Sequence, residues 1–358
     1  MSKKSYVIGK AALMMGLFIF SSGVWAGEAP FYQGKTLTVV QGAGDPGGTA
    51  DLRTRAVTTY LSKHLGGNPA VVFQYMSGGG GLQVANYVAA MARRDGLTIG
   101  VFPSSVFDHA IVGNPGARFE LKDFVFLGSP IGGGGPYTLA IRPALALDGI
   151  EKLRAFKGLR FAERSVGHTM YIIGRVMAFI LELREPRWIV GYGSSELGLA
   201  LERGEADARA NSLPSIVRET PHWLKEEFGF PVVMRDEIGR GLEVAPEFPQ
   251  NRPYLESYVD TELKRGMLRF RNAVRPAGNV FVAPRGVPEP ALRALQEALA
   301  RVWKDPQFVK DYQKQTQDLP TPVTGQEIED VLRELPMEPK IREVFKQVAG
   351  PGPLPPSR

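Results

Sequence analysis

Residues 36–49, TLTVVQGAGDPGGT, decide the fold. The first five residues are apolar or β-branched, which is typical of a strand. A glycine-rich turn follows, and residues 51–65 then place Leu52, Ala56 and Leu61 on one rough helical face. A strand, a glycine-rich turn and a helix in this order predict the start of a βαβ unit.

The same pattern repeats immediately downstream. Residues 70–73 (AVVF) predict a strand, residues 77–81 (SGGGG) a turn and residues 82–94 a helix. Residues 97–102 (LTIGVF) then predict a third strand. The order βαβαβ favours a parallel sheet that is flanked by helices, and therefore an α/β fold.

A second α/β unit is predicted beyond residue 128. Its expected strands are residues 137–141, 159–162, 188–190 and 207–210, and its expected helices are residues 149–156, 169–183 and 196–203. A strand at 279–283 and helices at 289–303, 306–315 and 325–335 follow, and we expect them to return to the first unit. The predicted division is lobe 1 at 27–127 plus 276–349, lobe 2 at 128–275, and a disordered tail at 350–358. Short crossings are expected near residues 128 and 275.

The N-terminal segment has the pattern of a secretory signal peptide. Lys3, Lys4 and Lys10 precede the apolar run 11–20, and Val24-Trp25-Ala26 places small residues where a signal peptidase cleaves. We therefore expect residues 1–26 to be removed and the protein to be periplasmic. The chain has no cysteine, so we expect neither a disulfide nor a lipid anchor.

The charge and the histidines exclude two classes of function. The formal charge is +6, and without the three lysines of the first 26 residues it is +3, which is too small to favour nucleic acid. His64, His109, His168 and His222 do not pair at the spacing of metal ligands. We expect no metal and no cofactor.

The two glycine-rich loops are typical of an anion site. Each follows a strand and opens a helix, so backbone N–H groups and the positive end of the helix dipole face the same point. Glycine permits the close approach that a bound anion needs. In an open α/β sheet, ligands bind at the carboxyl ends of the strands, where both loops are predicted to lie.

Nucleotide motifs fit the first loop only in part. Gly42, Gly44 and Gly47 satisfy G-x-G-x-x-G, but the second strand ends at residues 73–76 without the acid that binds a ribose. Gly48 stands where a phosphate-binding loop needs its lysine. We reject both the dinucleotide and the phosphate-loop interpretation.

A hydrolase is the remaining enzymatic alternative. Residues 191–195 (GYGSS) do not fit the nucleophile elbow G-x-S-x-G. Ser165 and His168 are close in sequence, but no acid is placed to orient the histidine. We therefore predict a protein that is not an enzyme and has no catalytic residues.

The order of several short motifs resembles that of the tripartite tricarboxylate transporter receptors, the Bug family of periplasmic solute-binding proteins. The motifs span nearly the whole chain after residue 26. They are YQGKT at 32–36, PGGTAD at 46–51, SGGGG at 77–81, RDGLT at 94–98, VGYGS at 190–194, GEAD at 204–207, LPS at 213–215, RP at 275–276 and APRGVP at 283–288. Each is weak alone, and their order and spacing carry the resemblance.

The resemblance implies a two-domain Venus-flytrap fold of type II, in which each lobe is a mainly parallel sheet flanked by helices. It also implies that a small carboxylate binds in the cleft. The ligand-binding residues that it implies are Ala43, Gly44, Asp45, Gly47, Gly48, Thr49, Ser77, Gly78, Gly79, Gly80, Ser104 and Ser105 in lobe 1, and Arg164, Ser165, Gly167, His168, Thr169, Tyr192, Asn211 and Ser212 in lobe 2.

Some of these positions depart from the family pattern. Asp45 puts an acid in the first loop, where it repels a carboxylate unless it faces away or meets an ammonium group of the ligand. Tyr75 and Met76 replace residues that are commonly asparagine and arginine, so a cation is lost, and Arg164 is the candidate to supply one from lobe 2. Asn211 stands where an acid is common.

We therefore expect a monomer that closes over a small organic anion and delivers it to inner-membrane transporter subunits. A sensor that presents the ligand to a signalling protein is the first alternative, and an exported hydrolase is the second. The residues leave the ligand open among dicarboxylates, tricarboxylates, aromatic acids and amino acids, because water-mediated contacts leave little trace in side-chain identity.

Overall fold

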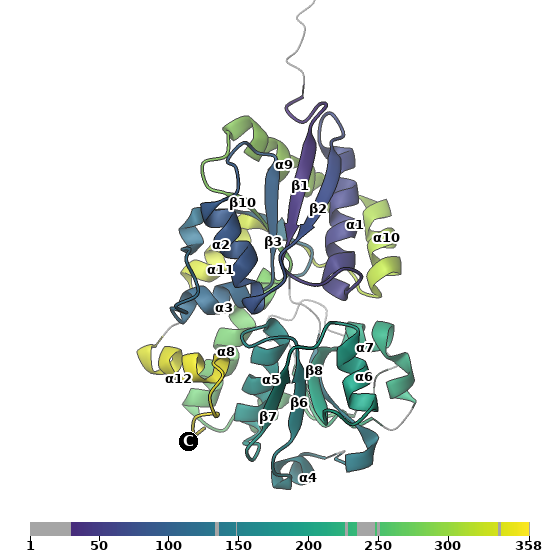
Figure 1. Ribbon diagram of the computed structural model, residues 1–358, viewed down its shortest axis with the longest axis vertical. Helices are drawn as coiled ribbons and strands as arrows, with labels where there is room; N and C mark the ends of the chain where they lie inside the picture. Colours follow the sequence, from purple (N-terminus) through teal and green to yellow (C-terminus); the bar gives the residue numbers. More distant parts are fainter. Residues whose placement is uncertain are drawn as a thin grey trace, which may run out of the picture.

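The computed structural model describes residues 30–132, 136–147, 149–225, 228–234, 248, 251–335 and 338–357. The predicted signal peptide, residues 1–26, lies outside the described residues. Figure 1 shows two lobes, one above the other, and each is built on its own sheet. The predicted α/β class with two lobes is confirmed.

Lobe 1 is built on a six-stranded sheet of order β11-β4-β10-β3-β1-β2. The strands are β1 (Thr36–Gln41), β2 (Ala70–Tyr75), β3 (Thr98–Phe102), β4 (Phe124–Ser129), β10 (Val280–Pro284) and β11 (Val323–Thr324). β1, β2 and β3 are parallel, as predicted, whereas β10 runs antiparallel between β3 and β4. The sheet is therefore mixed, and the late strand β10 lies in the same sheet as the strands nearest the N-terminus.

Helices cover both faces of this sheet. They are α1 (Thr49–His64), α2 (Leu82–Ala90), α3 (Ser105–Ile111), α9 (Glu289–Val302), α10 (Pro306–Thr316) and α11 (Gly325–Arg333). α1, α9 and α10 share one apolar cluster, and α2, α3 and α11 belong to another. The helical face that Ala56 and Leu61 predicted is buried in the first cluster.

Lobe 2 is built on a five-stranded sheet of order β7-β6-β8-β5-β9. The strands are β5 (Tyr137–Ile141), β6 (Arg160–Glu163), β7 (Arg187–Val190), β8 (Ala208–Ser212) and β9 (Val233–Met234). The helices are α4 (Ile150–Ala155), α5 (Thr169–Ile180), α6 (Glu196–Glu202), α7 (Leu213–Glu219), α8 (Glu262–Ala273) and α12 (Pro339–Ala349). α5 is mostly apolar and almost fully buried, because it packs between the sheet and the helices α8 and α12.

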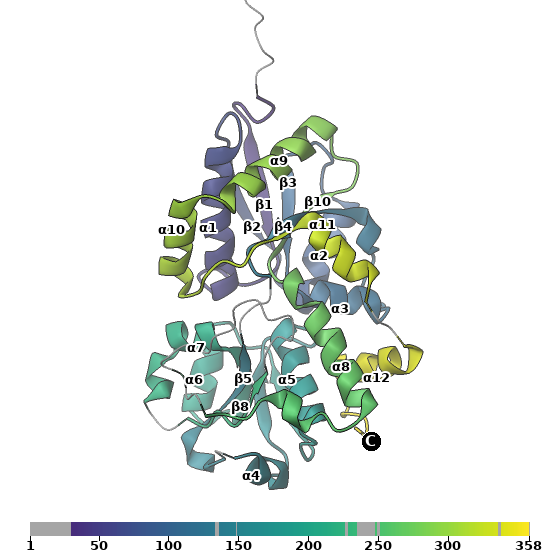
Figure 2. The same cartoon turned by 180° about the vertical axis from the view of Figure 1, so that it is seen from behind.

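The end of the chain differs from the predicted division. The prediction placed residues up to 349 in lobe 1, but α12 packs against α5 and α8 of lobe 2 through Ile341, Phe345 and Val348. Figure 2 shows α12 beside α8, apart from the other C-terminal helices. The chain therefore crosses between the lobes a third time, between α11 and α12.

The tail predicted to be disordered also contacts lobe 2. Arg175 lies inside α5 with its side chain fully buried, and its guanidinium donates to the carbonyl oxygens of Val348 and Gly352. The Tyr171 hydroxyl donates to Gly350 O at 2.7 Å. Buried backbone carbonyls need such donors, and these bonds hold the Gly/Pro segment against the lobe.

Candidate functional site

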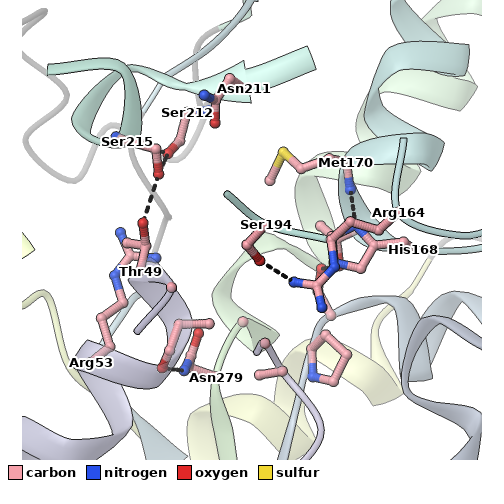
Figure 3. A pocket seen from close by; sticks show the side chains of 18 of the residues that line it. Thr49, Arg53, Arg164, His168, Met170, Ser194, Asn211, Ser212, Ser215 and Asn279 are labelled. Carbon is pink, nitrogen blue, oxygen red and sulfur yellow. Dashed lines mark hydrogen bonds between the residues drawn. The ribbon is translucent and has the colours of Figure 1, made fainter. Parts of the chain in front are cut away.

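A cavity of about 140 Å³ lies between the two lobes. A water needs roughly 10–15 Å³ of such space, so the cavity has room for a small organic molecule. Figure 3 shows side chains from both lobes around it. The lining residues are Ala43, Gly44, Gly48, Thr49, Ala50, Arg53, Pro103, Ser104, Ile131, Tyr137, Arg164, His168, Thr169, Met170, Ser194, Leu197, Arg209, Asn211, Ser212, Ser215, Glu219, Arg275, Gly278 and Asn279.

The first glycine-rich loop and the start of α1 form the lobe 1 wall. Gly48 is the N-cap of α1 and has no side chain to cap the helix, and Gly48, Thr49 and Ala50 all line the cavity. The positive end of this 16-residue helix therefore faces the cavity. Backbone N–H groups at such a helix start are a favourable environment for an anion.

β8 supplies the opposite wall from lobe 2. Arg209 and Asn211 lie two residues apart on this strand, so they share one face of the sheet. Arg209 is 6% exposed, and within the described part of the chain its guanidinium makes no hydrogen bond or ion pair. The Asn211 side-chain nitrogen is also buried without an acceptor. Buried donors without acceptors are costly, so both groups favour an anionic or carbonyl oxygen in the cavity.

Acids surround Arg209 at longer range. Burial lowers the pKa of Arg209, while Glu219 and Glu163 raise it and Arg164 lowers it further. An arginine remains charged in spite of such shifts. Glu163 is fully buried on β6, and burial raises its pKa to about 8, although Arg209 lowers it. Near neutral pH Glu163 is therefore mostly protonated, so the acid that acts on the charge of Arg209 is Glu219, which itself pairs with Arg218.

His168 caps α5 and presents a neutral ring to the cavity. Its Nδ1 accepts from the Met170 N–H at 3.3 Å. Burial and the nearby Arg164 lower its pKa to about 3, so the ring is uncharged near neutral pH. With Nδ1 accepting, the proton of the neutral ring lies on Nε2, which makes His168 a hydrogen-bond donor.

Hydroxyl groups connect the lobes around the cavity. Thr169 Oγ1 lies 3.3 Å from Ser104 Oγ and accepts from the Ser105 N–H at 3.3 Å. On another side, Thr49 Oγ1 donates to Glu219 Oε1 at 2.7 Å and lies 3.1 Å from Ser215 Oγ. These contacts join lobe 1 to lobe 2, so the cavity has both of its walls only while the lobes are together.

Asp45 and Arg164 form an ion pair across the cleft. Their carboxylate and guanidinium are 2.6 Å apart, and Arg164 also donates to Ser194 Oγ at 2.8 Å. Burial raises the pKa of Asp45, but Arg164 and hydrogen bonds from Ser194 and Ser77 lower it by more. Asp45 therefore faces lobe 2 but is directed at Arg164, and it is not part of the cavity lining.

The structure brings ten of the predicted ligand-binding residues to the cavity. They are Ala43, Gly44, Gly48, Thr49, Ser104, Arg164, His168, Thr169, Asn211 and Ser212. The others lie outside the lining: Asp45, Gly47, Ser77, Gly78, Gly79, Gly80, Ser105, Ser165, Gly167 and Tyr192. Gly80 and Gly167 form a close contact between the lobes, and the Tyr192 hydroxyl is directed at Glu205 instead, at 3.5 Å.

Sequence reasoning missed most of the cationic side chains of the cavity. Arg53 lies one turn into α1, Arg209 inside β8, and Arg275 in the 3₁₀ turn Arg275–Ala277 before β10. Arg53 pairs with Asp318 at 2.7 Å, and Arg275 lies over the ring of Tyr137. One signal was available, since an arginine inside a buried strand is rare and needs a partner.

Two negative findings apply to the described residues. Their histidine, aspartate and glutamate side chains form no cluster of three or more that could hold a metal ion. None of the helices in the described ranges combines the length and apolar character needed to span a membrane.

Comparisons with known proteins rest on structure alone. The chain matches no protein-family model, and no curated protein matches it in sequence. The periplasmic binding protein BugD superposes with a TM-score of 0.66 at 16% identity, covering 89% of this chain and 99% of its own. MatC from Rhodopseudomonas palustris with bound malate superposes with a TM-score of 0.63 at 18% identity, covering 88% of this chain and 99% of its own. An R. palustris protein with adipate superposes with a TM-score of 0.62 at 16% identity, covering 88% of this chain and 96% of its own. The chain therefore has the two-lobe fold of periplasmic binding proteins.

Proposed function

We propose that this protein is a periplasmic receptor of the tripartite tricarboxylate transporter type, which captures a small organic carboxylate between its lobes and delivers it to inner-membrane transporter subunits. The observation that carries the proposal is Arg209, a buried cation with no hydrogen-bond or ion-pair partner in the described residues, in the wall of the cavity between the lobes. Such a charge is costly until an anion pairs with it.

The remaining lining fits the same ligand. Asn211 and His168 add neutral donors to the charge of Arg209, and the start of α1 adds a helix dipole. Ile131, Met170 and Leu197 provide apolar surface for a short carbon skeleton. The similar structures with malate and adipate, together with the order of the sequence motifs, support a carboxylate among the anions.

The test is a thermal-shift and calorimetric screen of the protein without residues 1–26 against mono-, di- and tricarboxylates, aromatic acids and amino acids. A ligand that binds only the folded state stabilises it by about 2.7 kcal/mol at 100 times its dissociation constant. We expect at least one acid to bind. A screen in which only neutral or cationic solutes bind would contradict the proposal.

Arg209→Gln locates the site. Because a charge-assisted hydrogen bond contributes about 1.5–3 kcal/mol, we expect the variant to bind the acid roughly 10- to 150-fold more weakly. Arg293→Gln is the matched control, since Arg293 is an exposed arginine on α9 that pairs with Glu289. Equal loss of affinity in both variants would place the anion elsewhere.

A further inference from the structure

The ion pair between Asp45 and Arg164 has consequences for the charge of the cavity. Arg164 lines the cavity, while Asp45 lines a neighbouring pocket of about 500 Å³. The two spaces share Gly48, Ser194, Arg209 and Glu219. The Asp45 side chain is 33% exposed and that of Arg164 is 16% exposed. The pair is therefore positioned at the boundary between the two spaces.

Several polar groups hold Asp45 in this orientation. Ser194 Oγ donates to Asp45 Oδ2 at 3.2 Å, and the Ser194 N–H is directed at the same oxygen at 3.4 Å. Ser77 of the second glycine-rich loop, whose Oγ donates to Gly44 O at 3.3 Å, also lowers the pKa of the Asp45 carboxyl. Because these donors act together with Arg164, the carboxylate stays ionised and pairs with the cavity arginine rather than facing a ligand.

The two lobe 2 arginines of the cavity are therefore not equivalent. The charge of Arg164 is matched by Asp45 at 2.6 Å, whereas Arg209 makes no ion pair within the described residues. In lobe 1, Asp318 matches the charge of Arg53 at 2.7 Å in the same manner. Asp45 thus determines whether lobe 2 offers a ligand one guanidinium without an ion-pair partner among the described residues or two.

We propose that Asp45 is a specificity-determining residue, which limits the number of carboxylates on the preferred ligand by occupying Arg164. The inference rests on the proposed function, because it concerns the same cavity and the same class of ligand. Removing the charge of Asp45 frees the Arg164 guanidinium for a further carboxylate, because a guanidinium binds carboxylates through paired N–H groups.

The experiment measures the binding of butanoate, succinate and tricarballylate, which carry one, two and three carboxylates on short saturated chains, at about pH 7.5, where all of these groups are ionised. The protein is compared with Asp45→Asn by calorimetry. For the wild type and for the variant, we compare the affinity for the acid that the wild type prefers with the affinity for the acid that carries one more carboxylate. We expect this ratio to shift about tenfold toward the acid with more carboxylates in the variant, which is the effect of one added charge-assisted contact.

Four further variants isolate the effect. Asp45→Glu keeps the charge and should keep the wild-type order, and Asp45→Ser should reproduce Asp45→Asn if the amide disturbs folding. Asp330→Asn changes the net charge equally at an exposed pair with Arg333 on α11, and it should leave the order unchanged. In Asp45→Asn/Arg164→Gln, the added preference should disappear.

The outcomes separate this inference from the proposed function. If the wild type binds none of the acids in this set or in the wider screen, the carboxylate receptor is wrong. If the wild type binds acids but Asp45→Asn weakens all of them equally, Asp45 only holds the lobes together and its role in specificity is refuted. A shift of equal size in Asp330→Asn would reduce the effect to net charge and refute it as well.

Discussion

A Cβ atom on Gly80 would lie 2.2 Å from the carbonyl oxygen of Gly167. Gly80 belongs to the second glycine-rich loop of lobe 1, and Gly167 to the loop before α5 in lobe 2. Real Cβ atoms do not approach a backbone oxygen so closely, so glycine at position 80 is what allows the lobes to meet here. A loop that the sequence suggested as a ligand contact therefore has a steric role in closure.

The variant Gly80→Ala should weaken ligand binding more than it weakens folding. Its φ of +63° costs an alanine about 1–2 kcal/mol, and a contact of 2.8 Å between its Cβ and His109 Nε2 lies within lobe 1, so both are present whether the lobes are apart or together. The clash with Gly167 exists only when the lobes are together. We expect at least a tenfold loss of affinity for the carboxylate by calorimetry, with cooperative unfolding retained.

Gly113→Ala is the matched control for this variant. Gly113 has nearly the same φ, +65°, and a Cβ there would meet no atom within 4 Å. The control should show the backbone cost in chemical denaturation and bind the ligand normally. If both variants lose affinity equally, closure does not depend on the contact between Gly80 and Gly167.

The variant Arg209→Met should stabilise the protein without ligand. Removing a buried cation that has no ion-pair partner among the described residues relieves its desolvation cost, and methionine fills a similar volume. We expect the free energy of unfolding in urea to rise by about 1–3 kcal/mol. Added carboxylate should stabilise the wild type but not the variant.

Arg142→Met provides the opposite case. Arg142 pairs with the buried Asp207 at 2.9 Å, so its loss leaves a carboxylate with fewer partners and should destabilise the protein. A destabilised Arg209→Met would show that the guanidinium is compensated in solution and would remove the main support for the anion site.

The free energy of unfolding should fall as the pH rises through the titration of Glu163. Its folded-state pKa is raised from 4.5 to about 8, so between these values the native state holds a proton that the unfolded state has released. Because stability rises with pH only where the unfolded state binds more protons, it must fall here, and the loss is complete above about pH 8. Glu163→Gln, which is uncharged at every pH, should abolish this fall.

Denaturation curves at several values between about pH 5 and pH 9 measure the effect. The exposed acid Glu289 on α9 supplies the control, and Glu289→Gln should show the same fall as the wild type. If the free energy of unfolding depends on pH in the same way in the wild type and in Glu163→Gln, then Glu163 is ionised in the folded protein, with its charge paired to Arg209.

Elements could be predicted where the local pattern is strong. β1, β3 and β5 lie within one residue of their predicted bounds, because apolar runs bounded by turns are local signals. α8 was missed, since five of its twelve side chains are basic or acidic and it contains Gly266, although Leu263, Met267 and Phe270 lie on one apolar stripe. The burial of its Arg271 and Lys264 depends on partners distant in sequence, which local patterns do not specify.

The alternation of strands and helices and the two glycine-rich loops at strand ends could be predicted from the residues alone, because helical and strand periodicity and glycine's backbone freedom are properties of short segments. Only the tertiary structure decided that Arg53, Arg164 and Arg209 converge on one cavity. Tertiary packing also matched Arg164 with Asp45 and placed α12 on lobe 2. Charge pairing and burial depend on which distant residues the two sheets bring together, and this information is absent from any single segment.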